Sequence, residues 1–193
     1  MSSRADRFTV VIDTDVLVGA LTRNIILSLA EAGIFRARWS STTIDDEFVA
    51  FFVRKYPDKE ALGPKQKGAI ERAFPEGRIE VDPRLMQDLG LPDPKDRHVL
   101  AAAIQTKAAV IVTNNLKDFP ADCLDPFEVQ TVSADDFIAD CIDLGGPEAV
   151  VALRSMRERL QKPEMDAEAL ILRVEQIGLG QTATLLAHYQ AFL

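Results

Sequence analysis

The chain has 193 residues, 47% of them hydrophobic and 27% charged, which is enough for one well-buried core with a small extension. Its formal net charge of −8 excludes broad electrostatic adhesion to nucleic acid or anionic membranes, so a nucleic-acid ligand would need a local basic rim or a bound cation. Two cysteines favour a reducing compartment, and without a signal peptide or a run of about 18 apolar residues we expect a cytoplasmic protein that does not contact the membrane.

Strand and helix patterns alternate through residues 8–132. The first run, "FTVVID", is apolar and β-branched, which predicts a strand buried on both faces, as in parallel sheets. Further strands are expected at "FRARWS", "RIEVD", "AAVIVTNN" and "FEVQTV". Helices are expected at "TRNIILSLAEAGIF", "IDDEFVAFFVRKY", "GPKQKGAIERAF" and "PRLMQDL", the second of them capped by Ser40, Ser41 or Thr42. This alternation predicts an α/β fold with a central parallel sheet.

From about Ser133 the strand patterns stop. Three helices are predicted at "SADDFIADCID", "PEAVVALRSMRERL" and "PEMDAEALILRVEQIG", separated by Gly145-Gly146-Pro147 and by Pro163. We therefore expect an α/β domain over residues 1–145 and a C-terminal helical extension over residues 146–193.

The stretch "LPDPKDRHVLAAAI", residues 91–104, has two interpretations. On a helix, Asp96 shares a face with the apolar residues three, four and seven positions later, and a carboxylate on a buried face is expected to pair, to be neutralised or to bind a metal. Alternatively, Asp93 is the N-cap and Pro94 takes the first helical position. Asp96 then stands at the third position, where its negative charge interacts favourably with the helix dipole. His98 is expected on roughly the opposite face and is not expected to be catalytic.

Other acids lie where ligand sites collect in parallel sheets. Asp13 ends the first strand, at the carboxyl edge of the sheet, and Asp15 follows two residues later. In "TTIDDEFVAFF" the apolar face points Asp46 away, while Asp45 and Glu47 flank that face on opposite edges, and periodicity does not choose between these two. Capping, or a simple preference of acids for the first helical turn, would also explain each of them.

Polar residues also come after the strand "AAVIV", namely Thr113, Asn114, Asn115 and, in the next loop, Asp118. Such a cluster is often only a turn. Beside three carboxylates, however, it would complete a set of hard oxygen ligands converging at one edge of the sheet. Mg²⁺ or Mn²⁺ prefers such ligands, so the constellation predicts metal-assisted phosphoryl chemistry.

The succession "VVIDTDVLVGAL", "RWSSTTIDDEF", "LPDPKDRHVLAAAI" and "AAVIVTNNLKDFP" resembles the PIN domain, and within it the VapC-like toxin ribonucleases of bacterial type II toxin–antitoxin systems. The resemblance covers roughly residues 8–130, and its motif from Pro92 to Pro120 is the most specific part. It implies a three-layer α/β/α fold with a central parallel sheet.

The resemblance also assigns roles to individual positions. It implies that Asp13, Glu47 and Asp96 hold one or two Mg²⁺ or Mn²⁺ ions and that Asn115 adjusts a ligand or a water, which selects Glu47 over Asp45. The accessory candidates are Asp93, Asp15 and Asp118. Asp15 departs from the family pattern, in which a small or amide residue is more usual at this position.

By the same resemblance, the expected activity is that of an endoribonuclease that hydrolyses RNA phosphodiester bonds and leaves 5′-phosphate and 3′-hydroxyl ends. The expected partners are an RNA substrate such as tRNA, a cognate antitoxin that covers the active site, and a second copy in a homodimer. Five cations are candidates for a basic rim that contacts the RNA backbone: Arg36, Arg38, Lys65, Lys67 and Arg72.

Two alternatives remain open from the sequence. "VVIDTDVL" also fits the Asp-x-Asp signature of haloacid-dehalogenase-like phosphatases, with Asp13 as nucleophile and Asp15 as acid and base. The later motifs stand in the wrong order for that family, because the strand ending in Thr113 comes after the acid pair of Asp93 and Asp96. The other alternative is a catalytically silent PIN module that binds RNA or a protein.

Overall fold

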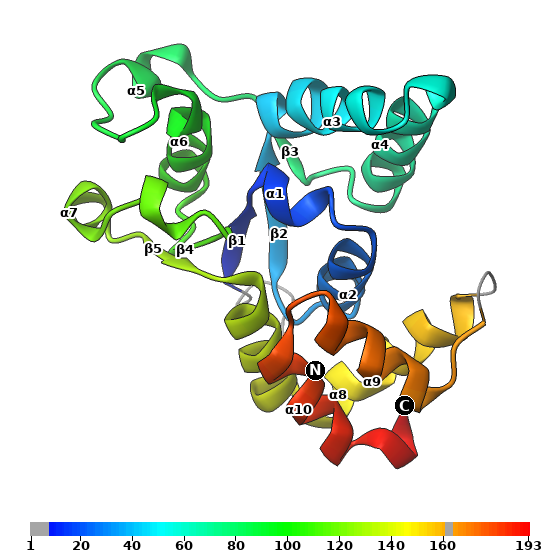
Figure 1. Ribbon diagram of the computed structural model, residues 1–193. Helices are drawn as coiled ribbons and strands as arrows, with labels where there is room; N and C mark the ends of the chain where they lie inside the picture. The colour runs from blue at the N-terminus through cyan, green and yellow to red at the C-terminus, as the bar shows by residue number, and fades with distance from the viewer. Residues whose placement is uncertain (1–7, 161–163) are drawn as a thin grey trace. The chain divides into compact units, whose positions relative to one another are not determined.

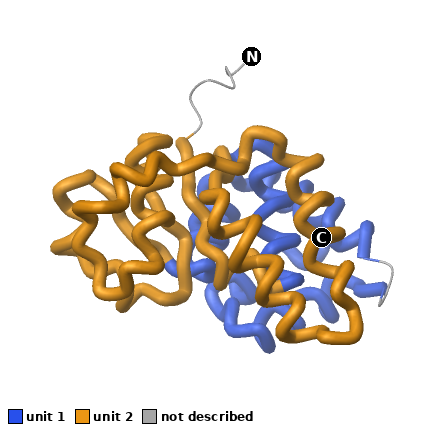
Figure 2. The backbone as a smooth tube through the Cα atoms, turned by 90° about the horizontal axis from the view of Figure 1, so that it is seen from above, with its two compact units in different colours: residues 1–7, 20–35, 133–193 blue, residues 8–19, 36–132 orange. Residues whose placement is uncertain are grey.

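The computed structural model describes residues 8–160 and 164–193, which divide into two compact units. One unit consists of residues 8–19 and 36–132, and the described part of the other comes from residues 20–35 and 133–193 (Figure 2). We refer to them as the sheet unit and the helical unit and describe each by itself.

The sheet unit is built on five parallel strands in the order β3-β2-β1-β4-β5 (Figure 1). Val10 of β1 pairs with Ala37 of β2 on one side and with Val110 of β4 on the other. All five predicted strands are present, each shorter than its sequence pattern, and the prediction of a parallel sheet is confirmed. The strands are β1 (Thr9–Ile12), β2 (Arg36–Ser40), β3 (Arg78–Ile79), β4 (Val110–Val112) and β5 (Gln130–Val132).

The strand order places a topological switch point between β1 and β4. From β1 the chain adds β2 and β3 on one side of the sheet, and it later adds β4 and β5 on the other. Val10, Val11 and Ile12 of β1 are fully buried, as expected for the central strand of a parallel sheet. Ligand sites of open α/β sheets lie beyond the carboxyl ends of the strands at such a point, which here means beyond Ile12 and Val112.

The helices of the sheet unit pack on the sheet and on one another, and they position the loops that follow the strands. The long apolar helix α6 packs on β1, β2 and β4, while α3 packs against α4. The α-helices are α1 (Thr14–Leu17), α3 (Phe48–Lys55), α4 (Leu62–Ala73), α5 (Pro83–Gln87), α6 (Arg97–Thr106) and α7 (Ala121–Leu124). Short 3₁₀ turns cover Pro57–Lys59, Pro94–Asp96, Leu116–Asp118 and Asp125–Phe127.

The helix predicted around "IDDEFVAFFVRKY" begins as a π-helical turn, Thr42–Glu47, which continues directly into α3. Of the three predicted caps, Ser40 acts, since its Oγ accepts the backbone N–H of Thr43 at 3.0 Å. Phe48 and Phe52 bury the apolar face of the helix. A π-turn changes the direction of the side chains after it, and such turns are frequent at functional sites.

The helical unit contains α2 (Ala20–Glu31), α8 (Ala134–Arg159), α9 (Ala167–Gln176), α10 (Gly180–His188) and a 3₁₀ turn at Gln190–Phe192. Helix α2 packs on α8, and α10 packs on both α8 and α9. The predicted break at the Gly-Gly-Pro segment is confirmed, because Gly146 kinks α8 with φ 48° and ψ −127°. Pro163, the other predicted break, lies outside the described residues.

Helix α10 was not predicted from the sequence. Its N-terminal N–H groups are capped from a distance: the carboxylate of Asp135, in α8, accepts the backbone N–H groups of Gln181 and Thr182, both at 2.9 Å. A cap supplied from the start of another helix leaves no local signal in the sequence around Gly180.

Across residues 8–160 and 164–193, no helix combines the length and the apolar character that crossing a membrane requires.

Candidate functional site

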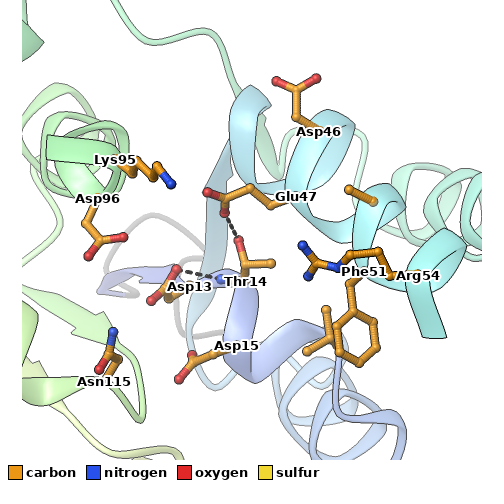
Figure 3. A pocket seen from close by; sticks show the side chains of 12 residues that line it. Asp13, Thr14, Asp15, Asp46, Glu47, Phe51, Arg54, Lys95, Asp96 and Asn115 are labelled. Carbon is orange, nitrogen blue, oxygen red and sulfur yellow. Dashed lines mark hydrogen bonds between the residues drawn. The ribbon is translucent and has the colours of Figure 1, made fainter. Parts of the chain in front are cut away.

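A pocket of about 640 Å³ opens in the sheet unit at the carboxyl ends of β1 and β4 (Figure 3). Its walls come from the start of α1, from the π-turn and α3, from the 3₁₀ turn before α6 and from the loop after β4. The residues that line it are Asp13, Thr14, Asp15, Val18, Asp46, Glu47, Ala50, Phe51, Arg54, Lys95, Asp96 and Asn115.

Asp13 is the most buried acid of the pocket, with 7% of its surface exposed. It comes directly after β1 and caps α1, because its Oδ1 accepts the backbone N–H of Thr14 at 2.6 Å. Its Oδ2 accepts the hydroxyl of Thr113, the first residue after β4, at 2.8 Å. Burial, and next the charge of Asp15, raise its pKa to about 6 in spite of these hydrogen bonds.

Glu47 is held from two sides. The hydroxyl of Thr14 donates a hydrogen bond to its Oε2, and Nε2 of His98 lies 3.3 Å from its Oε1. Burial acts to raise the pKa of Glu47, but the hydrogen bonds with His98 and Thr14 and the charge of Lys95 outweigh it and hold that pKa below its usual value. Glu47 is therefore ionised at neutral pH.

The expectation that the face of the helix carrying His98 lies away from the site is wrong, although His98 does not itself line the pocket. His98 is 4% exposed, and its Nδ1 lies 2.8 Å from Oγ of Ser40 at the end of β2. The error comes from treating α6 as a helix with one buried face. Since α6 contacts the π-turn as well as three strands, the side of the helix that carries His98 is buried too.

Asp45, the acid that periodicity could not separate from Glu47, has a structural role. Its Oδ2 lies 2.6 Å from Nη2 of Arg78, and its Oδ1 lies 2.7 Å from Nζ of Lys67. Burial opposes ionisation, but these two cations prevail and lower its pKa. Asp45 ties the π-turn to β3 and α4, while Glu47 lines the pocket.

The two interpretations of the stretch before α6 apply to different residues. Asp93 is the cap, since its Oδ1 accepts the backbone N–H of Lys95 at 2.9 Å, with Pro94 at the first position of the turn. Asp96 makes no capping hydrogen bond with any described residue and lines the pocket. Burial, followed by the charges of Asp13, Asp93 and Asp118, raises the pKa of Asp96 to about 6.

Asn115 completes the row of polar groups after β4. Its backbone N–H donates to the hydroxyl of Thr113 at 3.0 Å, and its side-chain amide donates to the carboxylate of Asp118. Asp15 lies at the exposed mouth of the pocket and accepts the backbone N–H of Asn114 at 2.9 Å. Although Asp15 is partly exposed, the protein around its carboxylate displaces water, and this desolvation is the main cause of its raised pKa.

The pocket therefore brings together Asp13, Glu47, Asp96 and Asn115, with Asp15 at its edge. Asp93 and Asp118 do not line it, although their charges act on Asp96. Sequence reasoning missed the groups that hold these side chains, namely Thr14, His98 and Ser40. Only Thr14 leaves a local signal, because it stands directly after the acid at the end of β1.

The donor set fits a hard divalent cation. Asp13 and Asp96 are carboxylates whose pKa values are raised by burial first and by neighbouring carboxylates second, so a bound cation would offset both effects. Within the described ranges, no three His, Cys, Asp or Glu side chains stand close enough together to bind one ion directly. Mg²⁺ usually binds through one or two carboxylates, several waters and a substrate phosphate, so a complete protein cage is not required.

We expect the metal-free protein to become more stable as the pH falls from 7.5 to 5.5. The pKa of Asp13 is about 6 in the folded chain, against 3.8 without its surroundings, so the folded state takes up a proton in this range and the unfolded chain does not. This contribution is complete below pH 3.8 and is lost as the pH rises through 6. It amounts to about 1 kcal/mol for Asp13 between the two pH values.

Urea unfolding in EDTA at both pH values measures the effect. The control is Asp13→Asn, which changes this carboxyl group alone and should show a smaller gain. An equal pH dependence in the two proteins would contradict the prediction.

Comparisons with known proteins agree with this geometry. A model of the PIN domain matches residues 9–117, which is more than half of the chain, and a model of the VapC50 C-terminal domain matches residues 134–188. A relative from Mycobacterium tuberculosis, described as "Putative ribonuclease VapC50", is 56% identical over 50 residues, or 26% of this chain and 30% of the relative. The matched segment thus spans less than a third of that relative. No solved structure matches.

The match to the PIN model, residues 9–117, includes all four central residues of the pocket. The resemblance stated from the sequence is confirmed, and so is the PIN-like α/β/α fold class with its C-terminal helical region. The chain belongs to the PIN domain family.

Proposed function

We propose that the protein is a divalent-metal-dependent endoribonuclease that hydrolyses RNA phosphodiester bonds, and that it acts as the toxin of a type II toxin–antitoxin system. The observation that carries the proposal is the gathering of Asp13, Glu47 and Asp96 in one pocket at the switch point of the sheet, with Asn115 beside them. Membership of the PIN family and the ribonuclease name of the relative support it.

In this proposal Asp13, Glu47 and Asp96 would hold one or two Mg²⁺ or Mn²⁺ ions, some of them through water molecules, because the three carboxylates do not converge closely enough to bind one ion directly. A cation held there would supply positive charge to the scissile phosphate and would lower the pKa of a water molecule. The same charge allows an acidic protein to accept RNA at this pocket.

The chain's own residues orient the ligands. Thr113 and the backbone of Thr14 direct the two oxygens of Asp13, while the hydroxyl of Thr14 and the ring of His98 direct those of Glu47. His98 is a positioning residue in this arrangement, because it acts through Glu47. Asp118 fixes the amide of Asn115 by accepting its N–H, so that the amide oxygen is left for a ligand or a water.

The wider assignment remains part of the proposal. We propose a cytoplasmic protein with a nuclease domain over residues 1–145 and a C-terminal extension over residues 146–193. The kink at Gly146 supports this boundary, whereas the helical unit and the match to the VapC50 C-terminal domain both begin earlier, near residue 133. Its proposed partners are an RNA substrate such as tRNA, a cognate antitoxin that covers the pocket, and a second copy in a homodimer.

The purified protein should cleave a total tRNA pool when Mg²⁺ or Mn²⁺ is present, and EDTA should reduce cleavage to background. Mapping of the product ends should find 5′-phosphate and 3′-hydroxyl groups. RNA binding without cleavage under either metal would instead identify the silent PIN module. A covalent aspartyl-phosphate on Asp13 would identify the phosphatase alternative.

A further inference from the structure

We propose that Arg54 and Lys95 form a two-point binding site for the RNA backbone phosphates that flank the scissile phosphate. This inference rests on the proposed function, because it names how the same pocket holds its substrate. It adds two cations from opposite walls of the pocket to the acids already described.

Helical spacing explains why Arg54 reaches the pocket. It stands seven residues after Glu47, four after Ala50 and three after Phe51, so all four share one face of the continuous π-turn and α3. All four line the pocket. Figure 3 shows the guanidinium of Arg54 on the same side of the pocket as Thr14 and Glu47.

Lys95 comes from the other wall. It lies in the 3₁₀ turn before α6, where Asp93 caps the backbone, and its side chain extends toward Glu47 (Figure 3). Its charge reaches the site, since it contributes to the low pKa of Glu47. In Figure 3, Glu47 lies between the side chains of Lys95 and Arg54, which come from opposite walls of the pocket.

Both side chains are available to bind a negatively charged ligand. Some other basic groups of the sheet unit are paired with acids, as Lys67 and Arg78 are with Asp45. Within the part of the chain that the structure describes, the side chains of Arg54 and Lys95 make no hydrogen bond and no ion pair.

A phosphodiester backbone is the ligand that this arrangement fits. The bound cation would offset the negative charge only at the scissile phosphate. The neighbouring phosphates of the RNA would be repelled by the acids of the pocket, namely Asp13, Asp15, Glu47 and Asp96, unless other cations bind them. Arg54 offers a planar fork that matches two phosphate oxygens, and Lys95 offers a compact point charge.

The five cations considered from the sequence as a basic rim do not line the pocket. Two of them have acidic partners: Lys67 bridges Asp45 and Glu71, and Nη2 of Arg38 lies 3.6 Å from the carboxylate of Glu76. Lys65 is exposed on α4 and lies outside the pocket, which makes it a suitable control.

The test measures binding of a short fluorescein-labelled single-stranded RNA by anisotropy at several salt concentrations between about 50 and 200 mM. Arg54→Gln and Lys95→Gln are made in an Asp96→Asn background, which keeps the RNA intact. Each should weaken binding about tenfold at low salt and reduce the slope of log affinity against log salt by about 0.7, the value for one lost contact with a single strand. Lys65→Gln should change neither quantity.

A second readout uses the otherwise unmodified enzyme. Loss of a contact to a flanking phosphate should raise KM about tenfold and leave kcat nearly unchanged, because the contact is the same in the ground state and the transition state. Unchanged salt slopes and KM in an enzyme that cleaves RNA would overturn this inference and leave the proposed function standing. Reduced salt slopes in a protein that never cleaves RNA would overturn the proposed function and support the binding site.

Discussion

Replacing Asp13 by asparagine should abolish RNA cleavage and at the same time stabilise the metal-free protein. Asp13 is 7% exposed, its pKa is raised to about 6 by burial and then by Asp15, and it would hold the cation that neutralises the scissile phosphate. Loss of that charge should lower kcat/KM by at least roughly 10³-fold.

The stabilisation has the same physical cause. The pKa of Asp13 is about two units higher in the folded protein than in the unfolded chain. At pH 7.5 Asp13 is ionised in both states, and keeping it ionised in the folded state lowers the free energy of unfolding by up to about 3 kcal/mol. Asparagine removes this cost and can still accept the backbone N–H of Thr14. The measured gain should be smaller than this limit, because the hydroxyl of Thr113 loses a charged acceptor.

Urea unfolding in EDTA and cleavage in Mn²⁺, both at pH 7.5, test the two effects together. Asp46→Asn is the matched control: Asp46 is exposed at the rim, and its carboxylate points away from the other acids (Figure 3). It should change neither quantity by much. Retained cleavage by Asp13→Asn would remove Asp13 from the metal site.

Replacing Asp96 by asparagine should abolish cleavage while the fold remains intact, whereas replacing Asp93 by alanine should mainly lower stability. Asp96 lines the pocket and makes no capping hydrogen bond with the described residues, so asparagine costs the helix little. Asp93 caps the 3₁₀ turn through the N–H of Lys95, and loss of such a cap costs about 1 kcal/mol.

The two variants serve as controls for each other. Chemical unfolding should place Asp96→Asn level with or above the parent protein, because the raised pKa of Asp96 shows that its charge is unfavourable in the fold, and should place Asp93→Ala below it. Cleavage measured below the unfolding transition should show the reverse order. If Asp93→Ala lost cleavage as completely as Asp96→Asn, the separation of cap and site would be wrong.

Local patterns were sufficient for much of the fold. Buried β-branched runs such as residues 9–12 and 110–112 identify strands by themselves, and the alternation with helices leaves a parallel sheet as the simplest arrangement. Helix α10 was not predicted because its cap, Asp135, lies 46 residues before Gln181. The π-turn was not predicted because the spacing of hydrophobic residues does not distinguish a π-helical turn from the first turn of an α-helix.

For the site, the sequence by itself determined which acids could matter: Asp13 at the end of a buried strand, Asp96 on the apolar side of a helix, and a polar group after a later strand. Which groups surround these acids was decided by the tertiary structure alone. It separates Glu47, held by Thr14 and His98, from Asp45, held by Arg78 and Lys67. The physical reason is that a carboxylate's pKa and orientation depend on partners 33 or 51 residues away in the chain, which no local periodicity contains.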